Sequence, residues 1–105
     1  MTANPLGRIN VATPGTPVQL ASSSTIAQRV RVQPRKNAST VNTGNVYLIT
    51  IGTGGKGTAT TIYAVLSPEQ VEGLELFPVG SNVFDLSLLY VDADTAADAV
   101  LVGYL

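Results

Sequence analysis

The stretch Val46-Tyr47-Leu48-Ile49-Thr50-Ile51 decides the fold, because each of its residues is β-branched, aromatic or aliphatic. Such an unbroken run is typical of a central strand that is buried on both faces. Four glycines follow between positions 52 and 57, and residues 60–66 (TTIYAVL) are again β-prone. The two β-prone segments therefore predict a β-hairpin with a glycine-rich loop.

Short strands and turns are also expected on either side of this hairpin. Residues 26–33 alternate between one face with Ile26, Gln28, Val30 and Val32 and another with Ala27, Arg29, Arg31 and Gln33. This alternation predicts one half-exposed strand with a basic outer row, which Pro34 ends before a polar loop over residues 35–45. Further strands are expected at residues 71–77, 86–91 and 99–105, with turns at 67–70 and 78–82 and a loop at 92–98.

One segment has features of a helix. Ser67 and Gln70 stand at the spacing of a capping box, but Gly73 and Pro78 leave room for two turns at most. We expect a turn there, followed by a strand that starts irregularly at Gly73. Short strands at intervals of roughly ten residues predict an all-β fold, a jelly-roll-like antiparallel β-sandwich or barrel.

The first 20 residues differ from the single β-sandwich domain predicted for residues 21–105. Pro5, Pro14 and Pro17 limit internal pairing, and we expect an extended N-terminal arm or edge strands. Two alternatives are open: the arm adds to a neighbouring chain, or it forms the first strands of its own sheet. The first alternative predicts that deleting residues 1–10 weakens assembly while the isolated fold keeps its thermal stability.

Composition bounds the function. The 105 residues fit one domain, and 45% of them are hydrophobic. Charged residues make up 12% of the chain, against about 25% in an average domain. So little charge suits a chain that is packed against neighbours, although a solitary β domain with a Thr- and Ser-rich surface has the same composition.

Histidine and cysteine are both absent, which removes imidazole bases, thiolate nucleophiles, disulfides and the usual zinc ligands. We therefore expect a protein that is not an enzyme and has no cofactor. The apolar runs are short and residues 1–5 lack the basic and apolar regions of a secretory leader, so we expect no membrane span and synthesis in a cytoplasm.

The two signs of charge are segregated along the chain. The cations lie within the first 60 residues: Arg8, Arg29, Arg31, Arg35, Lys36 and Lys56. The acids all follow Ser67: Glu69, Glu72, Glu75, Asp85, Asp92, Asp94 and Asp98. Opposite patches favour contact between copies, and we expect a homotrimer, with a dimer as the alternative. The candidate partner-binding residues are Arg8, Ile9, Val11, Arg29, Arg31, Arg35 and Lys36. Nucleic acid is not expected as a partner, since the isoelectric point is about 5.0.

Two motifs resemble ligand sites. Residues 52–57 (GTGGKG) match a dinucleotide-binding pattern, but a β-prone segment follows where that site needs a helix, so we expect a hairpin loop. Asp92, Asp94 and Asp98 gather three carboxylates, but the spacing is not that of an EF-hand. We expect a solvated loop there, with a looser ion site as the alternative.

Three parts of the chain carry a resemblance to a known family: residues 63–78 (YAVLSPEQVEGLELFP), residues 85–104 (DLSLLYVDADTAADAVLVGY) and residues 8–20. They resemble small virion proteins of tailed phages, in which an L-x-P-G-E turn precedes L-x-x-L-Y-V-x-A-x-x-x-G-D-x-V-x-V-x-Y. The departures are Glu69-Gln70 in place of Gly-Glu, and Ala97 in place of the glycine before Asp98.

This resemblance implies a capsid decoration (cement) protein. Such a protein binds the major capsid protein on the outer surface of the virion and stabilises the head, after synthesis in the host cytoplasm. The alternative is a β module of a tail or fibre that binds a receptor or carbohydrate. The absence of tryptophan argues against a sugar site, because sugar rings commonly stack on large aromatic side chains.

Overall fold

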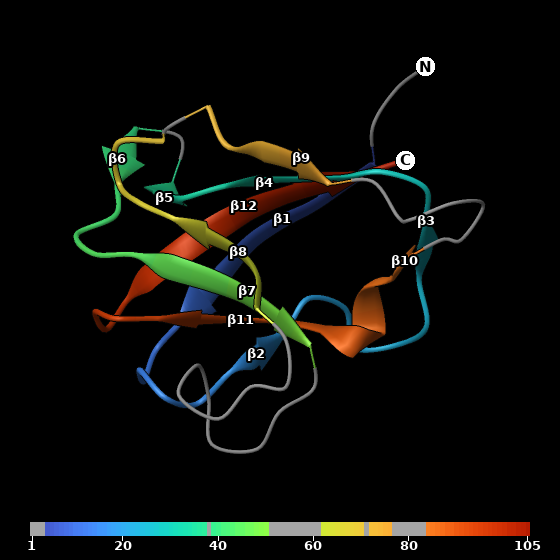
Figure 1. Cartoon of the computed structure of the whole chain (residues 1–105), viewed down its shortest axis with the longest axis horizontal. Coiled ribbons are helices and arrows are strands. Elements are labelled where there is room, and N and C mark those ends of the chain that lie inside the picture. Colours follow the sequence, from blue (N-terminus) through green and yellow to red (C-terminus); the bar gives the residue numbers. More distant parts are fainter. Residues whose placement is uncertain (1–3, 38, 51–61, 71, 77–83) are drawn as a thin grey trace.

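A computed structural model describes residues 4–37, 39–50, 62–70, 72–76 and 84–105. Two four-stranded antiparallel sheets form a β-sandwich, and the described residues include no α-helix. The first sheet has the order β1 (Asn4–Val11), β12 (Asp98–Tyr104), β4 (Val30–Gln33) and β9 (Leu74–Leu76). The second has the order β2 (Val18–Gln19), β11 (Leu89–Ala93), β7 (Val46–Thr50) and β8 (Ile62–Leu66) (Figure 1). The all-β antiparallel sandwich predicted from the sequence is confirmed.

The strands pair in a nested order. The first strand, β1, pairs with the last, β12, and the second strand, β2, pairs with the second-last, β11. Inside these, β4 pairs with β9, and the hairpin β7–β8 stands at the centre. The pairs β1–β12 and β4–β9 belong to the first sheet, and the pairs β2–β11 and β7–β8 belong to the second. In both sheets, segments far apart in the sequence therefore lie side by side.

The core lies between the two sheets and is aliphatic. Its fully buried members include Val11, Val30, Val32, Val46, Leu48, Leu66, Leu86, Val91 and Val100. On β7, Ile49 alternates with Leu48 onto the opposite face and is also completely buried. Tyr47 is half-buried. The predicted burial on both faces of the strand is therefore confirmed at Val46, Leu48 and Ile49 but not at Tyr47, while Ile51 and the glycine-rich loop lie outside the described residues.

The single strand predicted over residues 26–33 is wrong in its first half. The chain forms β3 (Ile26–Ala27) and β4, with a break at Gln28 and Arg29. The backbone N–H groups of Gln28 and Arg29 donate to the carbonyl of Leu105 instead of a neighbouring strand. β3 pairs with β10 (Phe84–Asp85) in a separate two-stranded sheet, so Ala27 is buried and Ile26 is exposed, the reverse of the predicted faces.

Two further boundaries differ from the expectation. Residues 35–45 contain a small hairpin of β5 (Arg35–Asn37) and β6 (Thr40–Val41) within the predicted polar loop. The strand expected at residues 86–91 begins only at Leu89, because Leu86–Leu88 form the 3-10 turn η2. In both places nearby polar side chains accept hydrogen bonds from backbone N–H groups. The hydrophobic pattern of the sequence does not reveal such contacts.

Pro68 and Glu69 form a turn, as expected for residues 67–70, whereas Glu72 lies in a further turn and β9 begins only at Leu74, later than the predicted start at residue 71. The side chain of Gln70 accepts a hydrogen bond of 2.7 Å from the N–H of Ser67, which is one half of a capping box. No helix follows, because Gly73 takes a left-handed conformation with φ of +81°. There the backbone of Gly73 lies directly against the carbonyl of Val32, and β9 starts one residue later.

The N-terminal segment pairs within its own chain. β1 runs antiparallel to β12 from Asn4 to Val11, with a register shift between Pro5 and Gly7, and β2 pairs with β11. Both are edge strands of their sheets among the described residues. Of the two alternatives left open by the sequence, the structure thus displays pairing within the chain.

We therefore expect deletion of residues 1–10 to destabilise the isolated fold, which reverses the expectation from the sequence. The deletion removes the strand that covers β12 and exposes backbone and core. The melting temperature of the truncated chain, measured by circular dichroism, should fall by more than 10 °C, on the order of 2 kcal/mol for a domain of this size. An unchanged melting temperature would contradict this role of β1.

Asp85 links two segments of the fold, residues 24–25 and residues 85–87. Its carboxylate accepts hydrogen bonds from the hydroxyl of Ser87 at 2.7 Å, the hydroxyl of Ser24 at 2.9 Å and the N–H of Thr25 at 3.2 Å. It also accepts the N–H of Ser87 and so caps η2. The Ser87 hydroxyl, followed by that of Ser24, lowers the pKa of Asp85 from 3.8 to about 2.

This lowered pKa makes stability depend on acid. Because the folded protein holds the carboxylate ionised, the contribution of Asp85 is present above the unfolded pKa of 3.8 and is lost as the pH falls toward 2. Urea unfolding at a series of pH values should show a gap between wild type and Asp85→Asn that narrows below about pH 4. A gap that stays constant down to about pH 2 would contradict the role of the ionised carboxylate.

Candidate interaction surface

The aspartates of residues 92–98 do not form the solvated loop that was predicted. Asp92 ends up on β11 and Asp98 begins β12, and both are completely buried, while Asp94 is exposed. The Asp92 carboxylate accepts the N–H groups of Gly15 and Ala93, at 2.9 and 2.8 Å. These carboxylates therefore hold the backbone in place, and in the described part of the chain no three acidic side chains are grouped to hold a metal ion.

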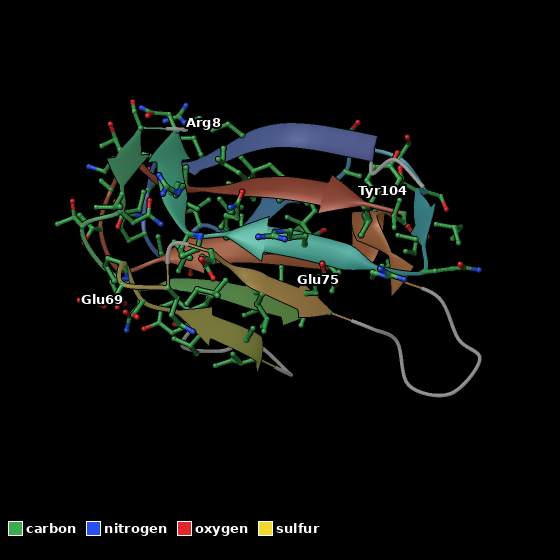
Figure 2. The ribbon with its side chains drawn as sticks, turned by 90° about the horizontal axis from the view of Figure 1, so that it is seen from above. Arg8, Glu69, Glu75 and Tyr104 are labelled. Atoms are coloured by element: carbon green, nitrogen blue, oxygen red, sulfur yellow. The ribbon has the colours of Figure 1, made fainter. Side chains whose placement is uncertain are left out.

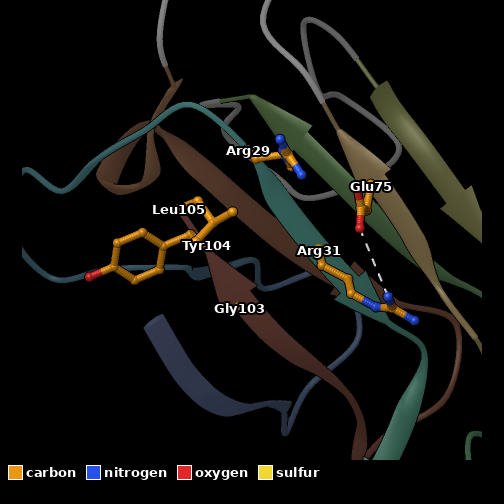
Figure 3. A pocket seen from close by; sticks show the side chains of 6 residues that line it. All are labelled: Arg29, Arg31, Glu75, Gly103, Tyr104 and Leu105. Atoms are coloured by element: carbon orange, nitrogen blue, oxygen red, sulfur yellow. Dashed lines mark ion pairs between the residues drawn. The ribbon is translucent and has the colours of Figure 1, made fainter. Parts of the chain in front are cut away.

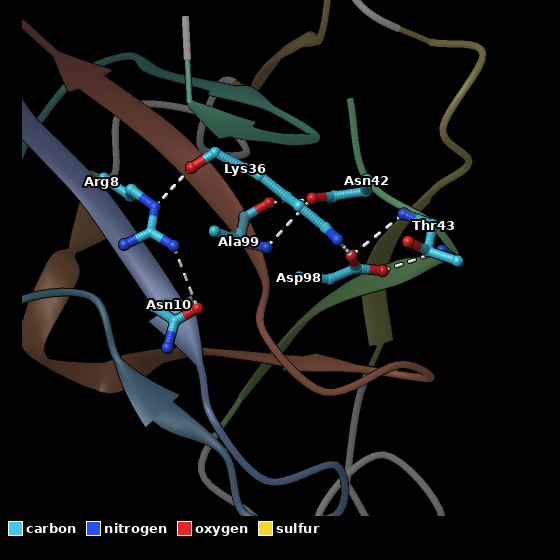
Figure 4. Close-up of polar contacts among 8 residues, drawn as sticks. Arg8, Asn10, Lys36, Asn42, Thr43, Asp98 and Ala99 are labelled. Carbon is cyan, nitrogen blue, oxygen red and sulfur yellow. Dashed lines mark hydrogen bonds and ion pairs between the residues drawn. The ribbon is translucent and has the colours of Figure 1, made fainter. Parts of the chain in front are cut away.

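Asp98 and Asn42 together fasten one end of the sandwich (Figure 4). Asp98 accepts the N–H groups of Thr43 at 2.9 Å and Gly44 at 2.8 Å. The buried amide of Asn42 donates to the carbonyl of Ala99 and accepts its N–H, so it replaces a strand partner. Ala97, which precedes Asp98, has a φ of +67°, a conformation that glycine adopts without strain.

Three of the predicted partner-binding residues gather at this end. Arg8 on β1 donates from its guanidinium to the backbone carbonyl of Lys36 on β5 and to the side chain of Asn10. The ammonium of Lys36 lies 3.8 Å from the Asp98 carboxylate. Arg35 precedes Lys36 on the same strand. Arg8 and Lys36 thus place a basic patch at this end, and the ammonium of Lys36 is paired with the buried carboxylate of Asp98.

Two other predicted residues line a different surface. Arg29 and Arg31 border a pocket of about 180 Å³ whose floor is formed by Gly103 and Leu105, beside Tyr104 and Glu75 (Figure 3). Arg31 lies opposite Glu75 across β4 and β9, and their charged groups are 3.9 Å apart. Because both side chains are about half exposed, this ion pair adds little to stability. An acid from the C-terminal part of the chain therefore pairs with a cation from its N-terminal part.

The remaining two predicted residues are less available to a partner. Val11 is completely buried in the core, so its proposal as a partner-binding side chain is wrong for this fold. Ile9 is partly buried and packs against the same core. Both point inward because they alternate on β1 with Arg8 and Asn10, which face outward.

The sequence analysis missed a group of exposed apolar side chains, which we call the apolar edge: Ile62 and Val65 on β8 and Leu74 on β9. Their exposed fractions are 47%, 47% and 39%. Val65 pairs with Tyr47 in regular register, and a register shift between Leu48 and Ile49 places Ile62 opposite Ile49, so both side chains lie on the outer face of their sheet. The absence of charge from residues 60–66 was the signal that could have revealed this edge.

The apolar edge lies along one side of the sandwich. β8 and β9 are the terminal strands of the two sheets among the described residues. Figure 2 shows them on the same side of the molecule, with β1 on the other. β8 contains neither charge nor proline, although natural edge strands are commonly protected by one or the other. An edge of this kind is suited to being covered by another protein.

The glycine-rich motif at residues 52–57 lies outside the described residues. No helix in the described ranges has the length and apolarity needed to cross a bilayer. No protein-family model, no curated protein and no solved structure matches this chain.

Proposed function

We propose that this chain is a decoration protein of a tailed-phage capsid, which binds the major capsid protein on the outer surface of the head and stabilises it without catalysis. The observation that carries the proposal is the apolar edge, where β8 is uncharged and large aliphatic side chains of β8 and β9 are left in water. Its support from the sequence is the resemblance of residues 8–20, 63–78 and 85–104 to small virion proteins.

The fold gives a second line of support by analogy. The nested pairing of the strands is the order expected of a jelly-roll-like sandwich, which we propose as the finer description of this fold. Jelly rolls are frequent in viral capsid proteins and in lectins, so the fold is compatible with both the capsid and the carbohydrate hypotheses. The exposed edge favours the capsid, because sugar recognition needs polar groups and stacked aromatic rings.

The mechanism is burial repeated over many copies. Covering Ile62 and Val65, each about half exposed, contributes roughly 1 kcal/mol per side chain. Among the described residues no further strand lies beside β8, so its backbone groups can add hydrogen bonds if a capsid segment pairs as an extra strand. These terms are small for one copy, so firm attachment requires either a larger contact of about 1,600 Å² or several linked copies.

A sedimentation experiment tests this function. Purified protein is mixed with capsids assembled without it, and separately with host cells and with host glycans. We expect saturable co-sedimentation with the capsids, together with greater resistance of the decorated capsids to heat. Binding to cells or glycans without binding to capsids would overturn the proposal in favour of a tail or fibre module.

A further inference from the structure

We infer that one end of the sandwich is an interface between two copies of this chain related by a two-fold axis. We call it the charged end and define it by Arg8, Lys36, Val41, Glu69 and Glu72. This inference goes beyond the proposed function and does not depend on it. It rests on three features that the fold brings together: a basic patch, an acidic hollow and an exposed valine.

The basic part is built by β1 and the β5–β6 hairpin. The hydrogen bond from the Arg8 guanidinium to the backbone carbonyl of Lys36 holds the Arg8 side chain against β5, while the Lys36 ammonium points to Asp98 (Figure 4). Val41 on β6 stands directly opposite Arg35 on β5 and is 46% exposed. The ammonium of Lys36 is paired with the buried carboxylate of Asp98, so the exposed guanidinium of Arg8 supplies the positive charge for a partner.

The acidic part is built by the turn before β9. Glu69 and Glu72 are exposed and border an open hollow of about 380 Å³ with Gln70 and Gly73. Within the residues the structure describes, neither glutamate makes an ion pair. The turn is held against the end of β4 by the close approach of Gly73 to Val32, and a guanidinium nitrogen of Arg31 donates to the carbonyl of Glu72 at 2.8 Å.

Both parts face the same end of the molecule. Figure 2 shows Arg8 and Glu69 at one end and Tyr104 at the other. Figure 1 places the β5–β6 hairpin at that same end. β4, which holds the acidic turn, is followed after Pro34 by β5, which carries the basic patch. The two charges are thus neighbours on one surface.

This placement selects the symmetry. Opposite patches at opposite ends would give a head-to-tail ring or filament, whereas neighbouring patches on one end pair with each other through a two-fold axis. The axis lays the basic patch of each copy on the acidic hollow of the other and brings the two Val41 side chains toward the centre. The structure therefore favours the dimer over the trimer expected from the sequence.

The dimer should be weak and sensitive to salt. The end face is bounded by molecular extents of 31 and 21 Å, which is small beside the roughly 800 Å² per partner of a standard interface. Its charges are exposed, so salt screens them over a Debye length of about 10 Å at 0.1 M. We expect a dissociation constant in the micromolar range, rising at least about fivefold between 0.05 and 0.5 M NaCl.

Charge reversal tests the pairing of the two parts. In sedimentation equilibrium at low salt, Arg8→Glu and Glu69→Arg should each raise the dissociation constant about tenfold, because each turns two attractions per dimer into repulsions. In the double variant both attractions are restored with their charges exchanged, so its dissociation constant should lie within about threefold of the wild-type value. Arg29→Glu, at the other end beside Tyr104, is the matched control and should change nothing.

The outcomes decide the inference. A double variant as weak as the two single variants would overturn the contact, as would a wild-type chain that is monomeric at about 1 mM or forms a salt-insensitive trimer. The salt titration of the unmodified protein needs no variant, so a folding defect in Arg8→Glu leaves the inference testable. Capsid binding in the separate sedimentation assay can fail while this dimer persists, so the two proposals fail independently.

Discussion

Replacing Asp98 with alanine is expected to lower the free energy of unfolding by about 3 kcal/mol. The carboxylate is completely buried and accepts two backbone N–H groups, and the ammonium of Lys36 lies close to it. Alanine leaves those donors without their acceptor and opens a void where the β6–β7 loop joins β12. Asp98→Asn keeps one acceptor oxygen and should lose roughly half as much.

Urea unfolding followed by circular dichroism measures both losses. Asp94→Ala is the matched control, because Asp94 is exposed and lies four residues earlier in the same segment. Its substitution removes the hydrogen bond from the Tyr47 hydroxyl and should cost less than about 1 kcal/mol. Equal losses for Asp94→Ala and Asp98→Ala would show that the buried carboxylate does not hold this end of the sandwich.

Replacing Gly73 with alanine is expected to cost about 3 kcal/mol, against about 1 kcal/mol for Gly15→Ala. Both glycines have a positive φ, +81° at Gly73 and +87° at Gly15, so both alanines carry the strain of a left-handed backbone. A Cβ at Gly73 would also lie 2.2 Å from the carbonyl oxygen of Val32, which belongs to the core strand β4 and cannot move aside. A Cβ at Gly15 meets nothing within 4 Å.

The comparison of these two variants isolates the backbone contact from the backbone strain. Thermal and urea unfolding should give a clearly lower stability for Gly73→Ala than for Gly15→Ala. The loss is expected because the new Cβ displaces β9 and the acidic hollow. If both variants lose the same stability, the close packing of the 67–73 turn on β4 is not a feature of the folded protein.

Local patterns were enough to predict the class of fold. The apolar run from Val46 to Ile49 forms the buried central strand, and alternation correctly places Val30 and Val32 inside and Arg31 outside. The break at Gln28 could not be predicted, because the acceptor that ends the strand is the carbonyl of Leu105 at the far end of the chain. A partner so distant in sequence leaves no periodic signal.

The candidate surface was only partly predictable for the same reason. The sequence identified the cations but not that Arg8 and Lys36 would lie together while Arg29 and Arg31 border a separate pocket. Asp92 and Asp98 looked like solvent-exposed acids because their donors, at Gly15 and Thr43, lie far away along the chain. The exposure of Ile62 depends on a register shift that only the pairing of β7 with β8 shows.

The occupancy of capsids by single-site variants tests the central claim most directly. Val65→Lys puts a charge on the apolar edge, and Ile26→Lys puts the same charge on an equally exposed apolar site in β3, away from that edge, with exposed fractions of 47% and 56%. In co-sedimentation with capsids that lack the protein, we expect Val65→Lys to reduce affinity at least about tenfold. Ile26→Lys should bind like wild type. Equal binding by both variants, or a loss confined to Ile26→Lys, would contradict the assignment of the apolar edge as the capsid-binding surface.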